Sequence, residues 1–170
     1  MIPTIDSILD EILRREGGFV DNPHDGGGPT NRGITLPALA RHRRRICTVA
    51  DLRDLTEAEA RDIYRDEYLH GPGLDKIRDP YLLALAFDCA VNHGPQRVIR
   101  WLQKIVHTID DGIFGDVTEV LVNSADPVPM YRRLLARRIE FYGEICVRDP
   151  SQVAFIVGWL RRACEFLEAA

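Results

Sequence analysis

The chain has 170 residues with a formal net charge of −4, and 45% of its residues are hydrophobic while 28% are charged. A chain of this length suits one domain, or one domain with a small appended lobe, and it can bury a core without disulfide bonds. The acidic balance gives no sign of a nucleic-acid-binding protein, and the longest apolar runs are far shorter than the roughly 20 residues of a membrane-spanning helix.

The N-terminal part of the sequence predicts three helices and one glycine-rich segment. The first helix ends at Gly17-Gly18, and its apolar residues are spaced by one helical turn: Ile5, Ile8, Leu9, Ile12 and Leu13. The segment 19–34 has no helical period, and its glycines and prolines predict an ordered loop or short hairpin. A second helix is expected over about 36–44, and a third over about 57–68, where Thr56 begins a capping-box pattern.

The C-terminal part predicts five further helices. The helix over 81–91 is apolar nearly all round and is expected to be buried. The others are expected over about 96–106, 116–122, 130–147 and 151–167. The last of them carries an apolar stripe: Val153, Ile156, Val157, Leu160, Cys164 and Leu167. These patterns predict a mainly α fold, divided into lobes over 1–75 and 76–170, with one shared core as the alternative.

Arginines are concentrated in a run at 41–45 and in the pairs Arg132–Arg133, Arg137–Arg138 and Arg161–Arg162. The simpler interpretation is that these arginines lie on solvated helix faces. The alternative is a local attraction for an anionic polymer.

The four cysteines are Cys47, Cys89, Cys146 and Cys164. Neither they nor the histidines have the spacing of zinc ligands, so we expect no metal and no cofactor. Cys89 and Cys164 lie among apolar residues and are expected to be buried thiols. A disulfide bond between cysteines is the alternative.

Glu16 follows Ile12 by one helical turn, so it is expected to continue the apolar face of the first helix and to point toward the interior. An apolar environment keeps a carboxyl group protonated, as a general acid requires. From position alone, the alternative is a carboxylate paired with a nearby arginine: Arg14, Arg15 or Arg32.

Asp25 supplies a second carboxyl group in the glycine-rich segment. A loop Asp beside glycines is usually a turn residue, but glycoside hydrolysis generally needs two carboxyl groups that flank the scissile bond. Thr30 could hold a water molecule through its hydroxyl group, and the glycines around Gly27 would let the loop backbone lie close to sugar rings.

The stretch from Glu16 to Thr35 reads EGGFVDNPHDGGGPTNRGIT and resembles the N-terminal signature of glycoside hydrolase family 108, the phage-type N-acetylmuramidases. Further segments resemble that family and its C-terminal peptidoglycan domain in the same order: Tyr64 to Tyr68, FDCAVNHG at 87–94, WLQ at 101–103, DGIFGDVT at 111–118 and GWLRR at 158–162. The resemblance covers about residues 5–162, and several ordered motifs are far more specific than any one of them.

This resemblance implies a lysozyme-like helical fold with a small hairpin after the first helix. It also implies a peptidoglycan hydrolase that cleaves the β-1,4 bond between N-acetylmuramic acid and N-acetylglucosamine, with Glu16 as the catalytic acid. Asp25 and Thr30 are expected to act on water or on the developing cation. Residues expected to contact the glycan are Tyr64, Tyr68, Asn92, Gly27 and Arg32.

Two positions depart from the family pattern, because Arg32 and Leu69 stand where aromatic residues are common. Both departures would reduce stacking on sugars. Asp88 lies one turn before Asn92 in the apolar helix, where it is either a core Asp with a partner or part of the glycan cleft.

The alternative function is a non-catalytic module that binds peptidoglycan or acts as a scaffold. Such a module would be expected to lose the acid or its loop, and this chain keeps both. Amidase or peptidase chemistry usually needs zinc or a Cys/His pair, which the spacing does not suggest.

The expected partner is the glycan strand of bacterial peptidoglycan, bound by a monomer, with no nucleic acid and no stable membrane insertion. No secretory signal is visible, so we expect synthesis in the cytoplasm of a bacterial host and action on the cell wall in the periplasm after release. For a phage endolysin that lyses bacteria, release would depend on a holin-made membrane lesion; a host cell-wall remodelling factor is the alternative.

Overall fold

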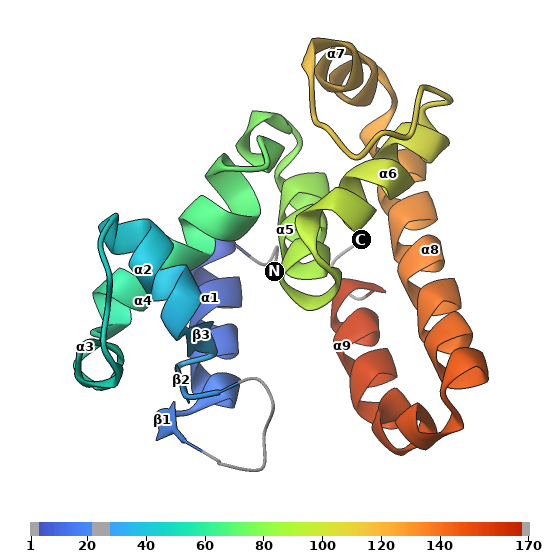
Figure 1. Cartoon of the computed structure of the whole chain (residues 1–170). Coiled ribbons are helices and arrows are strands. Elements are labelled where there is room, and N and C mark those ends of the chain that lie inside the picture. Colours follow the sequence, from blue (N-terminus) through green and yellow to red (C-terminus); the bar gives the residue numbers. More distant parts are fainter. Residues whose placement is uncertain (1–3, 22–27, 168–170) are drawn as a thin grey trace. The chain divides into compact units, whose positions relative to one another are not determined.

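The computed structural model describes residues 4–21 and 28–167. The fold is mainly helical with one small three-stranded sheet, which confirms the expected fold class (Figure 1). Backbone contacts divide the chain into two compact units, one spanning 5–71 and the other 72–167 with Thr4. No helix in the described ranges is long and apolar enough to cross a membrane.

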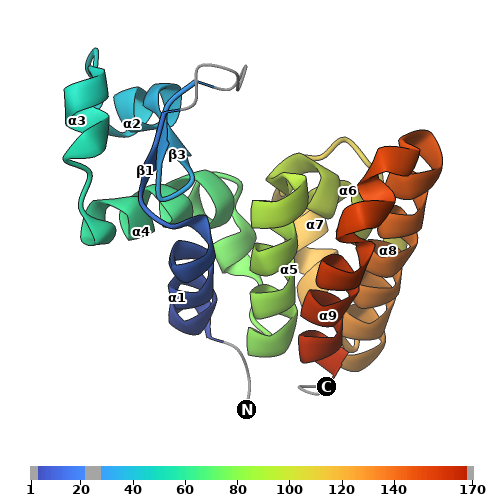
Figure 2. The same cartoon turned by 90° about the horizontal axis from the view of Figure 1, so that it is seen from below.

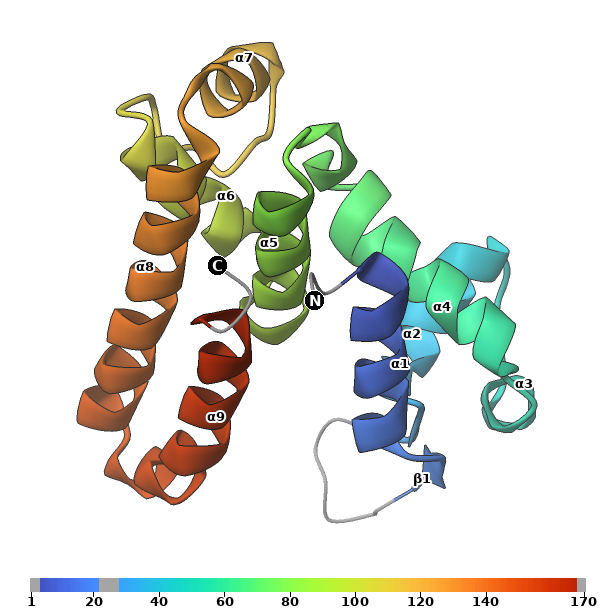
Figure 3. The same cartoon turned by 180° about the vertical axis from the view of Figure 1, so that it is seen from behind.

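The N-terminal unit is built from helices that pack around a small apolar core. Their bounds are α1 Ile5–Glu16, α2 Leu36–Arg43, α3 Val49–Arg53 and α4 Glu57–Arg65, followed by the π-helical turn η1 Asp66–His70. Helix α4 contacts both α1 and α2 (Figure 3). The core between them contains Leu9, Leu39, Leu52 and Ile63, all without exposed surface.

The glycine-rich segment contains a short antiparallel sheet, formed by β1 Phe19–Val20, β2 Thr30–Asn31 and β3 Ile34–Thr35. The strands lie against α2 and α3 (Figure 2). The buried Asn31 amide donates hydrogen bonds to the carbonyl oxygens of Leu52 and Arg53, at 2.8 and 3.1 Å. This contact fixes the hairpin to the end of α3, where carbonyl groups lack helical partners.

Two local features of this unit were not predicted. Helix α3 has only five residues and little apolar period, but Thr48 and Asp51 form a complete capping box at its start. The third predicted helix ends at Arg65 as an α-helix and continues as the π-helical turn through His70. Such turns often occur at functional sites, and this one contains Tyr68.

The C-terminal unit is a group of helices around the buried helix α5. Its elements are the 3-10 turn η2 Leu74–Lys76, α5 Pro80–His93, α6 Pro95–Ile105, α7 Asp116–Ser124, α8 Pro127–Arg148, the 3-10 turn η3 Pro150–Phe155 and α9 Ile156–Leu167. Helix α5 packs against α6 and α8, and α9 folds back along α8 through η3 (Figures 1 and 3). The prediction of a buried central helix over 81–91 is confirmed.

A buried charge cluster joins three helices of this unit. Asp88 on α5 is 1% exposed and lies 2.7 Å from Arg138 of α8, and it also accepts hydrogen bonds from Arg162 of α9. The prediction that the arginine pairs lie on solvated helix faces is therefore wrong for Arg138 and Arg162, which are 0% and 8% exposed. Of the two alternatives for Asp88, the structure therefore supports a core residue with charged partners and not a residue of the glycan cleft.

The apolar stripe of the last predicted helix is not buried. Val153, Val157, Leu160 and Leu167 are exposed, while α9 buries Arg162, Ala163 and Phe166 instead. The expectation of a buried Cys164 thiol fails for the same reason, because Cys164 lies on the exposed face; Cys89 is fully buried as expected. All four cysteines are free thiols.

The DGIFGDVT turn is held by one buried side chain, Gln103. Its amide nitrogen shares its two hydrogens among three acceptors at 2.8–3.1 Å: Asp111, the carbonyl oxygen of Ile113 and Thr118. Its amide oxygen accepts from the Gly112 backbone at 2.9 Å. The turn is thus a structural feature of the C-terminal unit, with the buried amide fully hydrogen-bonded.

His93, at the end of α5, is expected to make the stability of this unit depend on pH. Burial and then the positive charge of Arg138 lower the pKa of His93 to about 4, and its Nε2 atom has no hydrogen-bond partner among the described residues. The unfolded chain binds this proton at a higher pH, near 6.5, so stability should fall as the pH decreases from about 6.5 to about 4.

Urea unfolding followed by tryptophan fluorescence measures this effect, since both tryptophans, Trp101 and Trp159, belong to the C-terminal unit. His93→Phe keeps a ring beside Trp101 and Phe141 and is expected to give a shallower loss of stability between pH 6.5 and 4. An unchanged slope in this variant would show that another group causes the pH dependence.

Candidate active site

Glu16 is the last residue of α1, and its side chain is exposed. The prediction that it points into the interior is wrong. Ile12 and Leu13 are the last buried residues of the apolar face, and the chain leaves the helix at Gly17, in the left-handed conformation with φ of 68°. The helix therefore presents the carboxyl group to solvent at its end.

The Glu16 carboxyl group lies beside the tight turn between β2 and β3. Arg32 and Gly33 form this turn with φ angles of 52° and 75°, as expected for a two-residue type I′ hairpin. A Cβ atom placed on Gly33 would lie 2.8 Å from Oε2 of Glu16 and still closer to the hydroxyl oxygen of Tyr64. Glu16, Gly33 and Tyr64 thus meet at one point, and only glycine leaves room for both side chains.

Tyr64 connects the turn to α4. Its hydroxyl group donates a hydrogen bond to the carbonyl oxygen of Arg32 at 3.1 Å. Burial, followed by the negative charge of Glu16, raises the pKa of Tyr64 well above its ordinary value of about 10. Tyr64 therefore keeps its proton at any physiological pH and can hold the turn in place.

Tyr68 stacks on Tyr64 with ring centroids 5.7 Å apart. Burial is the main cause of its raised pKa, and the charges of Glu67 and Glu16 add to it. Tyr68 is half-buried whereas Tyr64 is only 4% exposed, so of the two rings Tyr68 has more surface for a ligand.

Most arginines of this unit have acidic partners. Arg14 and Arg15 bind Glu11, and Arg32 lies 3.6 Å from Glu57. Glu16 forms no ion pair with any residue that the structure describes. In the described part of the chain, none of these three arginines therefore neutralises Glu16, as the alternative interpretation of the sequence would require.

Thr30 and Asn92 each have contacts of their own within their units. Thr30 is half-buried in β2, where its register partners are Val20 and Thr35. Asn92 belongs to α5 in the C-terminal unit, and its amide donates to the backbone oxygen of Asp88 at 2.6 Å. Asp25 and Gly27 lie outside the described residues. The structure thus brings together Glu16, Arg32, Tyr64 and Tyr68.

Gly33 is the member of this group that the sequence did not single out. Its local signal is a two-residue turn with glycine in second place, between the β-branched residues of the TNRGIT segment. That signal predicts the hairpin, but the contact with Glu16 and Tyr64 joins elements far apart in the sequence.

Gly33→Ala should damage both folding and activity of this site. A non-glycine residue in the left-handed region costs about 1–2 kcal/mol, and the new methyl group would displace Glu16 or Tyr64. Since small misplacements of reacting groups can cost about 100-fold in rate, we expect an activity loss of that order, measured as release of soluble fragments from sacculi.

Gly73→Ala is the matched control, because Gly73 lies outside the proposed site and has a similar φ of 80°, while an added Cβ would meet only ordinary contacts, the nearest at 3.6 Å. It should share the backbone strain without the displacement. Equal activity losses in the two variants would mean that the contact of Gly33 with Glu16 and Tyr64 is unimportant.

The sequence matches two family models. The model described as Glycosyl hydrolase 108 matches residues 9–94, and the one described as Predicted Peptidoglycan domain matches residues 97–164. These ranges meet near the end of α5, whereas the backbone contacts divide at Gly71, so the division into lobes 1–75 and 76–170 stays a prediction.

One solved structure with high similarity is that of Brucella abortus SagA. The two chains are 29% identical and superpose with a TM-score of 0.74, covering 95% of this chain and 90% of the other. No curated protein sequence matches the chain significantly.

Proposed function

Because the chain belongs to glycosyl hydrolase family 108, we propose that it is an N-acetylmuramidase whose general acid is Glu16. Family membership and the peptidoglycan domain make it a glycoside hydrolase that acts on peptidoglycan. The observation that carries the finer proposal is the exposed Glu16 carboxyl group, held at the end of α1 beside the Arg32–Gly33 turn.

In the proposed reaction, Glu16 gives its proton to the glycosidic oxygen between N-acetylmuramic acid and N-acetylglucosamine. The bond from C1 of the muramic acid to that oxygen breaks, and positive charge develops on the muramic acid ring. Asp25, with Thr30, is proposed to stabilise this charge or to direct a water molecule to C1. Water supplies the new hydroxyl group, and its proton returns to a carboxylate.

Tyr64 is proposed as a positioning residue for Glu16. Its only proton is used in the hydrogen bond to the Arg32 carbonyl oxygen, so toward Glu16 it can only accept. A protonated Glu16 can donate to this oxygen, whereas an ionised one cannot. Tyr68, Arg32 and the backbone around Gly27 are proposed to contact the glycan, and Asn92 is kept as a further candidate.

The biological setting is proposed as that of an endolysin. A monomer would be made in the cytoplasm of the bacterial host and released through a holin-made lesion to degrade the cell wall and lyse the cell. The family and the peptidoglycan domain support the target polymer, and the phage setting is our extension of that support.

Mass spectrometry of the fragments released from purified sacculi tests the bond. A muramidase leaves muramic acid at the reducing end of each soluble muropeptide. Reducing-end N-acetylglucosamine or free stem peptides would contradict the proposal. Binding to sacculi without any soluble fragments would support the non-catalytic alternative instead.

A further inference from the structure

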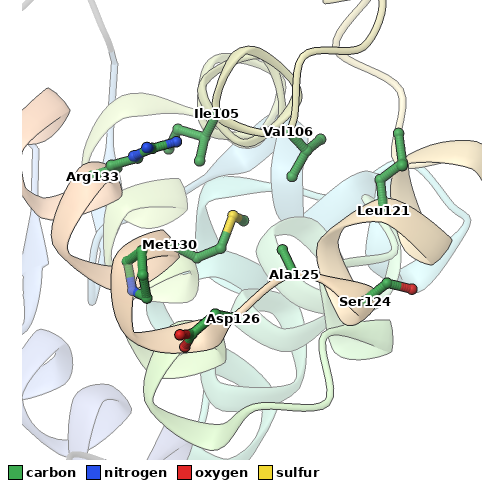
Figure 4. Close-up of a pocket in the computed structure, with 9 residues that line it drawn as sticks. Ile105, Val106, Leu121, Ser124, Ala125, Asp126, Met130 and Arg133 are labelled. Atoms are coloured by element: carbon green, nitrogen blue, oxygen red, sulfur yellow. The ribbon is translucent and has the colours of Figure 1, made fainter.

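A cavity of about 410 Å³ opens in the C-terminal unit, at the ends of α6 and α7 and the start of α8 (Figure 4). This volume lies within the range of small-ligand sites, roughly 300–1,000 Å³. The residues that line it have no part in the reaction proposed for Glu16. A ligand of this cavity would therefore be a part of the peptidoglycan strand other than the scissile bond.

The inner wall of the cavity is aliphatic. Met130 of α8 is 3% exposed and forms part of it, together with the half-buried Ile105 and Val106 at the end of α6 and with Leu121 of α7. No aromatic ring lines the cavity, so it has no platform for stacking a sugar. A short methylene chain suits such a wall, and a methionine side chain can adapt to it.

The edge of the cavity carries one positive and one negative side chain. Figure 4 shows the Arg133 guanidinium group and the Asp126 carboxylate on different sides of Met130. Both residues are exposed, and Arg133 forms no ion pair with any described residue. Asp126 caps α8 by accepting from Val128 at 3.0 Å through Oδ1, which leaves its second oxygen available.

The helix ends reinforce this separation of charge. Helix α7 ends at Ser124, close to Asp126, where carbonyl groups of a helix C-terminus favour a cation. Helix α6 ends at Ile105, which Figure 4 shows beside Arg133, so this end favours the guanidinium group. Helix α8 begins at the cavity, but Pro127 and Pro129 remove two backbone donors from its first turn, so an anion would depend on Arg133. The cavity thus fits an aliphatic chain that ends in both an ammonium and a carboxylate group.

We propose that this cavity binds the free end of the diamino acid in a peptidoglycan stem peptide. The three methylene groups of diaminopimelate would lie against Val106, Leu121 and Met130. Its ammonium group would meet Asp126 and its carboxylate would meet Arg133. The choice of polymer rests on the proposed function, while the choice of ligand rests on the cavity.

Isothermal titration of the full chain with the tripeptide L-alanyl-γ-D-glutamyl-meso-diaminopimelate tests this assignment. The tripeptide has no glycosidic bond, so its binding does not require Glu16 or hydrolysis. Arg133→Gln removes the positive charge, and Asp126→Asn removes the negative charge while keeping a good helix cap. Each should weaken binding about tenfold, as expected for loss of a hydrogen bond to a charged group.

Arg132→Gln is the matched control, because Arg132 is an exposed neighbour on α8 that does not line the cavity; it should bind like the wild type. The tripeptide with lysine in place of diaminopimelate lacks the terminal carboxylate. It should bind about tenfold more weakly, as for one lost charged contact, and its binding should be insensitive to Arg133→Gln.

Equal affinity for the two tripeptides, or no effect of Arg133→Gln on the first, would overturn the proposal. Free diaminopimelate carries the same methylene, ammonium and carboxylate groups, so it should also bind and should lose affinity in Arg133→Gln; a tripeptide that binds where free diaminopimelate does not would also overturn the proposal. The two proposals can fail independently. If the tripeptide binds through Arg133 but the protein releases no muropeptides, the cavity assignment is supported and the muramidase assignment is contradicted.

Discussion

Replacing Glu16 by Gln is expected to slow the release of muropeptides by about 100- to 10,000-fold, the usual contribution of a general acid. An amide cannot give a proton to the departing glycosidic oxygen, although it has nearly the same shape as the carboxyl group. Because Glu16 is exposed and forms no ion pair with a described residue, the variant should keep the thermal stability of the wild type. The release of fragments from sacculi and a thermal unfolding curve measure both effects.

Asp10→Asn is the matched control for this substitution. Asp10 lies on the same helix, is exposed, and pairs with Arg61, so its loss should leave the rate unchanged and alter stability by less than about 1 kcal/mol. A Glu16→Gln variant as fast as the wild type would remove Glu16 from the reaction. An equal loss of rate in Asp10→Asn would point to damage of α1 instead.

The sequence predicts a buried Glu16 side chain, whereas the structure shows it exposed. The helical period correctly places Glu16 in line with Ile8 and Ile12, but burial also requires another element to cover that position. Helix α1 ends there, and the chain turns away at Gly17. Periodicity predicts the direction of a side chain, whereas its environment depends on elements that are distant in the sequence.

In the C-terminal unit, the sequence pattern predicts exposed side chains where the structure has buried ones. Arg138 and Arg162 look like surface residues in the sequence, since each belongs to an arginine pair. They are buried because three helices bring them to Asp88. In α9, the burial of Arg162 accompanies the exposure of the apolar residues Val157, Leu160 and Leu167. A charged residue becomes a core residue only when a partner is in place, and no local pattern contains that information.

The Asp88 cluster is expected to be essential to this unit, so Asp88→Asn should lower its free energy of unfolding by about 3–5 kcal/mol. The amide removes the negative charge and leaves the guanidinium groups of Arg138 and Arg162 buried without compensation. The remaining contacts of Arg138 are its hydrogen bond to Tyr142 at 2.6 Å and the faces of Tyr142 and Phe166. Urea unfolding followed by the fluorescence of Trp101 and Trp159 reports on this unit.

Two further variants separate buried charge from general damage. Asp110→Asn breaks an exposed pair with Lys104 and should cost less than about 1 kcal/mol. The triple variant Asp88→Leu, Arg138→Met, Arg162→Met removes all three charges, and it should lose less stability than Asp88→Asn alone because no unpaired charge remains. If the triple variant were the less stable of the two, the cluster would stabilise the fold through its hydrogen bonds and shape, and uncompensated charge would not be the reason that Asp88 is needed.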